Sequence, residues 1–198
     1  MPTLPLFATY LSSEMVYEDT SALNHNAYEF KLSSEFSQIT KELKVLKNYP
    51  KIKKILLNKF KKFAKDTLSY NNDFAITTSW FTRIEKGQYS EFHCHKNSFY
   101  SGVYYHDEYS NNSAPIEFYS PIYGLSDFSL GDASESTLQN SSSWDIPPKK
   151  NSLLLFPSYL NHRIGTHHED SPRYSLAFNI IPIGEYGHGD SRMKILGW

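Results

Sequence analysis

Residues 173–179 read Arg-Tyr-Ser-Leu-Ala-Phe-Asn, in which small or polar side chains alternate with large apolar ones. Successive side chains of a β-strand point to opposite faces, so Arg173, Ser175 and Asn179 share one face. Similar short runs, bounded by turn residues, fill the chain from Phe74 onward. They cover residues 74–84, 90–95, 100–106, 115–119, 152–156, 162–165 and 172–181. This many short strands predicts a mainly β fold, a barrel or jelly roll.

Three regions differ from this strand pattern. Apolar residues at helical spacing predict helices at 34–47 and 51–68, divided by Pro50, and a short strand is expected near Leu6–Leu11. Residues 120–150 are rich in Ser, Gly, Asn and Pro, which predicts an insertion that is either a lid or a surface loop. We expect one domain over 1–198, with an N-terminal strand and helical buttress (1–70), a β core (74–182) and a C-terminal tail (183–198).

The composition favours a single globular domain and disfavours disulfide-stabilised and membrane-spanning proteins. With 39% apolar residues, a chain of 198 residues can form one ordinary core. A single cysteine, Cys94, excludes an intrachain disulfide, and the absence of a long apolar stretch predicts a cytoplasmic protein with no membrane span. Residues 41–65 hold ten Lys but one acid, Glu42. We expect them to form a solvated helix face behind the sheet, so nucleic acid is not an expected partner.

A histidine pair suggests a metal site. His93 and His95 lie two residues apart in a strand-like run, so both imidazoles face the same side and Cys94 faces the other. Neutral imidazoles bind Fe, Zn, Cu or Ni. His162 opens a later strand, and a ligand from such a distant segment completes a facial triad. Cys94 is predicted to be a buried, inert thiol.

Arg173 suggests an anion site. If its face of the strand lines the interior of the barrel, the buried guanidinium needs an anion, and its planar fork matches a carboxylate. The alternative is an exposed arginine at a strand edge, paired with Glu169 or Asp170. The residues themselves leave both arrangements open.

Four motifs in this order, TTSWFTR (77–83), HCHKNSFYSGVYY (93–105), LLLFPSYLNH (153–162) and RYSLAFN (173–179), carry a family resemblance. The chain resembles the 2-oxoglutarate/Fe(II) oxygenases of marine bacteriophages and bacteria. The resemblance implies a double-stranded β-helix, the jelly-roll fold of cupins, and the N-terminal helices expected from the spacing would precede it. It also implies Fe(II) near the barrel mouth, 2-oxoglutarate as co-substrate, and a hydroxylation with O2 that releases succinate and CO2. If phage-encoded, the protein would act in the host cytoplasm.

The same resemblance assigns site residues. His93 corresponds to the first iron ligand and His162 to the distal one, while Arg173 and Ser175 correspond to the residues that hold the far carboxylate of 2-oxoglutarate. Tyr105 matches a tyrosine that reaches this carboxylate in related hydroxylases. No catalytic group is expected beyond the metal centre.

One position departs from the family pattern. Most of these oxygenases have Asp or Glu two residues after the first histidine, where this chain has His95. The preferred interpretation is a triad of three histidines, since an imidazole is a better Fe(II) ligand than an amide. Two alternatives remain: a slipped register with Asn97 in the carboxylate position, or a two-histidine site completed by water. His167 and His168 lie too close to Arg173 to match the distal ligand and are interpreted as surface histidines.

The substrate does not follow from the sequence. Analogy with prolyl hydroxylases suggests a peptidyl side chain, and a small molecule is the alternative. Trp80, Phe99 and Tyr100 are expected to keep the cavity dry. Two competing hypotheses are a cupin-like metal enzyme that does not use 2-oxoglutarate and a non-catalytic jelly-roll module with a binding or structural role. The oligomeric state is open, and a homodimer is compatible with the sequence.

Overall fold

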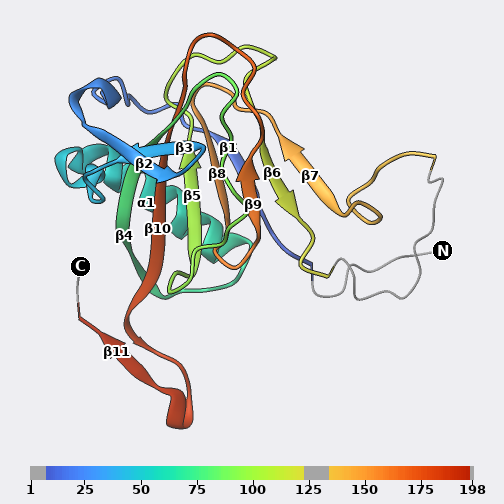
Figure 1. Ribbon diagram of the computed structural model, residues 1–198. Coiled ribbons are helices and arrows are strands. Elements are labelled where there is room, and N and C mark those ends of the chain that lie inside the picture. Colours follow the sequence, from blue (N-terminus) through green and yellow to red (C-terminus); the bar gives the residue numbers. More distant parts are fainter. Residues whose placement is uncertain (1–7, 123–133, 197–198) are drawn as a thin grey trace.

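The computed structural model of the protein describes residues 8–122 and 134–196 (Figure 1). Strands dominate it, together with one α-helix and three short 3-10 helices. In chain order the elements are β1 (Ser12–Met15), η1 (His25–Ala27), β2 (Phe30–Ser34), β3 (Ser37–Thr40), η2 (Val45–Asn48), α1 (Pro50–Asp66), β4 (Asp73–Ile84), β5 (Tyr100–Tyr104), β6 (Ile116–Tyr119), β7 (Ser143–Ile146), β8 (Ser152–Pro157), β9 (His162–Ile164), β10 (Arg173–Tyr186), η3 (Gly189–Ser191) and β11 (Met193–Ile195).

The larger sheet has eight strands and runs in the order β1-β8-β5-β10-β4-β3-β2, with β11 paired to the end of β10. All these pairings are antiparallel. The long strand β10 lies at the centre, with Arg173 opposite Ile84 of β4 and Leu176 between Phe81 of β4 and Tyr104 of β5. From Leu176 to Ile180, β10 has a strand on each side, whereas Arg173 and Ser175 pair with β4 alone.

The smaller sheet has three strands in the order β7-β6-β9. It lies to one side of the larger sheet in Figure 1, and apolar residues of both sheets pack together between them. Val103, Leu154 and Phe156 come from the larger sheet, and Ile116 and Phe118 come from β6. Two antiparallel sheets enclosing a core confirm the predicted jelly roll, a double-stranded β-helix.

Helix α1 lies behind the larger sheet (Figure 1). Ile52, Leu56, Phe60 and Ala64 recur every four residues and form a buried stripe in the same core cluster as Phe74 of β4. Pro50 is tolerated as the first helical residue because its missing N–H would have no partner there. The prediction that this lysine-rich helix packs behind the sheet, away from the barrel interior, is confirmed. No helix among the described residues is long and apolar enough to cross a membrane.

The prediction of a helix over 34–47 is wrong. Strands β2 and β3 form a hairpin here, and β3 pairs with β4 through Ile39 and Thr82. Only the end of this region, η2, is helical. Pairing with the preformed edge of β4 outweighs the weak local helix propensity of the Ser-rich run.

Other boundaries also differ from the predictions. Residues 90–95 form no strand beyond an isolated bridge between His93 and His162. The strand expected near Leu6–Leu11 is β1, which starts at Ser12; of the predicted range, residues 6 and 7 lie outside the described residues. The expected insertion contributes β7 to the smaller sheet, and residues 123–133 of it lie outside the described residues. Part of the expected tail continues β10 and forms a hairpin with β11.

Candidate metal and co-substrate site

Backbone hydrogen bonds bring the three predicted metal ligands together. His93 N donates to His162 O (3.1 Å), and His162 N donates to His93 O (3.0 Å), so the two residues form a reciprocal bridge. His95 N donates to Ser158 O (2.8 Å), in the turn that leads from β8 to β9. The loop that carries His93 and His95 is therefore fastened to the segment that carries His162.

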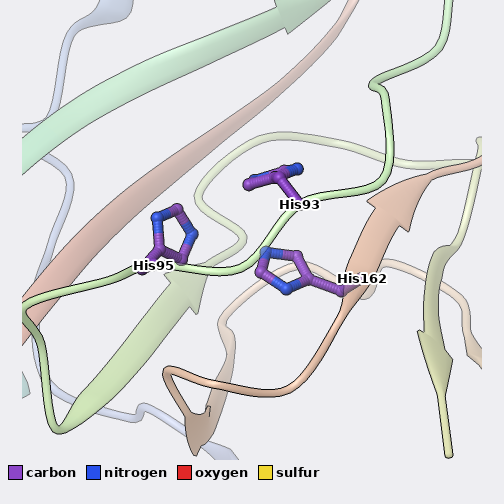
Figure 2. Close-up of side chains that lie close together, drawn as sticks. All are labelled: His93, His95 and His162. Carbon is purple, nitrogen blue, oxygen red and sulfur yellow. The ribbon is translucent and has the colours of Figure 1, made fainter.

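The three imidazole rings converge, as Figure 2 shows. One nitrogen from each ring lies within 4.8 Å of the other two, which is a spacing that could hold one metal ion. Nδ1 of His93 donates to Glu91 O (2.8 Å) and Nδ1 of His162 to Leu160 O (2.8 Å), because a carbonyl can only accept. These bonds leave Nε2 of both rings with a free lone pair, the usual state of a metal-binding histidine.

The environment keeps the two more buried rings neutral. Burial, followed by the nearby His93, lowers the pKa of His162 to about 3. The same two causes lower the pKa of His95 to about 4. Neutral imidazoles offer their lone pairs to a metal near pH 7 without first releasing a proton.

The register favours His95 over Asn97. His95 belongs to the converging cluster and lines the cavity described below, and its ring lies 5.6 Å from that of Trp80. Asn97 is exposed, has a left-handed φ of 61°, and is not among the residues lining the cavity. The structure thus assembles the three-histidine arrangement and not the slipped alternative.

Arg173 is buried, with 2% of its surface exposed. Its Nε donates to Ala114 O (2.8 Å), its Nη1 to Ser175 Oγ (3.4 Å) and its Nη2 to Tyr105 Oη (3.3 Å). The predicted group of Arg173, Ser175 and Tyr105 therefore comes together. Burial raises the pKa of Tyr105, although Arg173 opposes the shift, so the phenol keeps its proton.

The alternative of an exposed arginine paired with a neighbouring acid is wrong. Glu169 accepts hydrogen bonds from Ser110 and Ser113, and Asp170 pairs with Lys86. Across residues 8–122 and 134–196, no carboxylate forms an ion pair with Arg173. A buried guanidinium whose partners are all neutral can accommodate an anion from outside the chain.

One cavity joins the histidines to the arginine. Its volume is about 180 Å³, and all three histidines line it together with Arg173, Ser175 and Tyr105. Hydroxyl groups and apolar side chains make up most of the remaining wall, and no Asp, Glu or Lys of the described residues lines it. Arg173 is thus the one permanent charge on the described wall.

A comparison with protein families identifies the family to which the chain belongs. The profile of the 2OG-Fe(II) oxygenase family matches residues 78–179, which run from within β4 into β10 and include every residue of β10 that lines the cavity. The chain belongs to the 2OG-Fe(II) oxygenase family. Enzymes of this family use Fe(II) and 2-oxoglutarate, and the predicted family and class of enzyme are confirmed.

Solved structures resemble this oxygenase in fold. HygX from Streptomyces hygroscopicus, determined with nickel, 2-oxoglutarate and hygromycin B, is 12% identical; the match covers 88% of this chain and 83% of HygX, with a TM-score of 0.60. A prolyl-4-hydroxylase from Pseudomonas putida is 13% identical, with coverage of 87% and 92% and a TM-score of 0.55. At such low identity these matches show the fold alone. No curated protein matches the sequence of this oxygenase.

The donor sets of this oxygenase fit the two groups that its family uses. Three imidazoles suit Fe(II), which binds nitrogen and oxygen ligands. The guanidinium and the hydroxyl groups of Ser175 and Tyr105 suit a carboxylate. Both sets line one cavity, so a single small molecule could contact the metal at one end and Arg173 at the other.

Some predicted features of the surroundings are wrong. Cys94 is half-buried instead of buried, because its segment is not a strand with one side in the core. Phe99 and Tyr100 pack in the core on the α1 side of the larger sheet, and only Trp80 of the three predicted aromatic residues lines the cavity. His168 is exposed as predicted, but His167 is buried.

Sequence reasoning missed a polar network beneath His95. Ser101 Oγ lies 2.8 Å from Ser158 Oγ and donates to Asn179 Oδ1 (2.9 Å), whose amide group donates to Thr78 (3.0 Å). Ser158 is also the residue whose carbonyl holds the His95 backbone. Asn179 shares the alternating face of Arg173, and this pattern was the available signal.

Proposed function

We propose that this oxygenase holds Fe(II) through His93, His95 and His162 and holds the far carboxylate of 2-oxoglutarate through Arg173, Ser175 and Tyr105. The observation that carries the proposal is Arg173, a buried guanidinium without a carboxylate partner among the described residues, in the same cavity as the three converging imidazoles. A cupin-like metal enzyme that does not use 2-oxoglutarate would have no need for this arginine.

Bound Fe(II) supplies the redox chemistry by which O2 oxidises 2-oxoglutarate to succinate and CO2 while one oxygen atom enters a substrate C–H bond. The histidines contribute position, because the backbone bridge joins the segments that carry His93 and His162. The guanidinium fork of Arg173 orients the co-substrate, and the neutral phenol of Tyr105 can donate a further hydrogen bond. The apolar wall keeps bulk water from the reacting groups.

A triad without a carboxylate also bears on co-substrate binding. Three histidines bring no negative charge to Fe(II), whereas the usual two-histidine, one-carboxylate triad cancels one of its two charges. The additional positive charge favours the dianion 2-oxoglutarate, and Arg173 adds a second positive charge at the far end. We infer that a triad without a carboxylate is compatible with the family reaction.

The substrate group that enters the cavity is expected to be small and uncharged. Ser33 and Ile39 of the β2–β3 hairpin also line the cavity, together with Trp80, Thr82 and Ser90, and none of these residues carries a charge. The cavity of about 180 Å³ leaves little room beside a co-substrate. A peptidyl side chain or a small molecule that presents one such group fits these limits, with hydroxylation as the expected outcome. A cytoplasmic location and a bacteriophage origin remain predictions.

Anaerobic titration tests the proposal. Fe(II) is added to the protein with and without 2-oxoglutarate, and the visible metal-to-ligand charge-transfer band is followed. We expect the band only when both are present, together with succinate release once O2 is admitted. A protein that binds Fe(II) tightly but never 2-oxoglutarate would support the cupin-like alternative, and one that binds neither would support a non-catalytic module.

A further inference from the structure

His167 is a buried histidine near the co-substrate end of the cavity, with 1% of its surface exposed. Its Nδ1 accepts a hydrogen bond from Ala114 N (3.3 Å), and its Nε2 donates to Ser171 O (2.8 Å). One partner can only donate and the other can only accept. The ring is therefore satisfied as a single neutral tautomer.

His167 contacts the backbone N–H of the same residue whose carbonyl holds Arg173. The carbonyl of Ala114 accepts the Nε hydrogen bond of Arg173 at 2.8 Å, the shortest bond of the guanidinium. The two terminal nitrogens contact only the hydroxyl groups of Ser175 and Tyr105, at 3.4 and 3.3 Å. Hydroxyl groups can rotate, whereas a fixed carbonyl sets the plane of the guanidinium and leaves the terminal fork for a ligand.

His167 is itself fixed. Its backbone N–H donates to Gln88 O (2.9 Å) and its carbonyl accepts from Gly87 N (2.7 Å), in the turn after β4. Its Nε2 reaches Ser171, two residues before Arg173 at the start of β10. The imidazole thus ties the Ala114 segment to the paired strands β4 and β10.

We propose that His167 is a positioning residue for 2-oxoglutarate: it holds the backbone N–H of Ala114, and the carbonyl of the same residue aims the guanidinium of Arg173 into the cavity. This inference rests on the proposed function of Arg173. Co-substrate affinity then depends on the Nδ1 bond of His167 more than on its Nε2 bond, because only the Nδ1 bond leads to Ala114.

Two conservative variants separate these bonds. In His167→Asn the amide oxygen can accept from Ala114 N, as Nδ1 does, and the bond to Ser171 is lost. In His167→Gln the longer amide can donate to Ser171 O, as Nε2 does, and the bond to Ala114 is lost. Each variant loses one buried hydrogen bond, so a purely structural role would weaken both alike.

The experiment measures 2-oxoglutarate binding to anaerobic, Fe(II)-loaded protein, with Fe(II) affinity and melting temperature measured alongside. We expect His167→Gln to raise the Kd for 2-oxoglutarate about tenfold while His167→Asn stays near the wild type, and Fe(II) affinity to be unchanged in both. His168→Ala, at the exposed neighbouring histidine, is the matched control. The Arg173 Nε–H signal in NMR spectra should exchange faster with water in His167→Gln than in His167→Asn.

Three results would overturn the inference. If the two variants lose 2-oxoglutarate affinity equally, or if neither loses it, His167 does not position Arg173, although the proposed function stands. If the wild type binds Fe(II) but no 2-oxoglutarate, the proposed function fails and this inference fails with it.

Discussion

Replacing Arg173 is the most direct test of the co-substrate site. In the free protein its guanidinium is buried and contacts one carbonyl and two hydroxyl groups. Arg173→Ala should therefore abolish measurable 2-oxoglutarate binding but leave Fe(II) affinity nearly intact, since the arginine is not among the converging metal ligands. Arg173→Lys should restore binding only in part, because an ammonium cannot present a planar fork.

The size of the effect follows from the bonds that are lost. A carboxylate held by two charge-assisted hydrogen bonds gains about 1.5–3 kcal/mol from each. Losing both would cost about 3–6 kcal/mol, or roughly two to four orders of magnitude in Kd. Stability should respond in the opposite sense. Without co-substrate, Arg173→Met removes a buried charge at similar volume, so its free energy of unfolding should stay the same or rise.

The assay is an anaerobic titration of Fe(II)-loaded wild type, Arg173→Ala and Arg173→Lys with 2-oxoglutarate, followed by the charge-transfer band. Urea unfolding of Arg173→Met with and without 2-oxoglutarate gives the stability comparison. Unchanged 2-oxoglutarate turnover in Arg173→Ala would refute the reasoning. So would an equal loss of Fe(II) and 2-oxoglutarate affinity, because it would indicate a general collapse of the cavity.

Three further changes test other parts of the structure. His95→Ala should weaken Fe(II) binding at least about tenfold, measured by anaerobic competition with a chelator, while His95→Asp should largely retain it. Equal Fe(II) affinity in the wild type and His95→Ala would exclude His95 as a ligand. Gly102→Ala would place a Cβ 2.3 Å from Phe178 Cζ, and we expect a loss of roughly 1–3 kcal/mol in urea unfolding, partly restored by Phe178→Leu. His106 shares one hydrogen bond with His25 (3.1 Å), and burial lowers its pKa from 6.5 to about 4. Its contribution to stability is therefore present above pH 6.5 and lost as the pH falls toward 4, so the melting temperature should fall less steeply over this range in His106→Gln; parallel curves would contradict this.

The site was more predictable than the surrounding elements. His93, His95, His162 and Arg173 could be identified because four motifs occur in a fixed order, and their assembly needs only the strand topology of the family. The preference for His95 over Asn97 followed from ligand chemistry and agrees with the geometry. Whether these residues bind iron and 2-oxoglutarate is a matter for the experiments above.

The errors have a common physical cause. The prediction of a helix over 34–47 relied on local spacing, whereas pairing of β3 with β4 decides the structure of that segment. The burial of Cys94 was inferred from strand alternation, which does not apply to a loop held by isolated bridges. The exposure of His167 was judged from its neighbours in sequence, but its environment comes from Ala114 and from the turn after β4. Each case depends on contacts between distant segments, which single-sequence patterns do not report.

The reciprocal bridge between His93 and His162 has a consequence for how the enzyme exchanges its metal. In a zinc finger the ion itself assembles the ligands, so removing it unfolds the domain. Here backbone hydrogen bonds join the segments that carry His93 and His162. The chain entropy lost in bringing these segments together is therefore already lost when the sheets form. If these histidines bind iron as proposed, repeated cycles of depletion and reloading should proceed without any refolding of the chain.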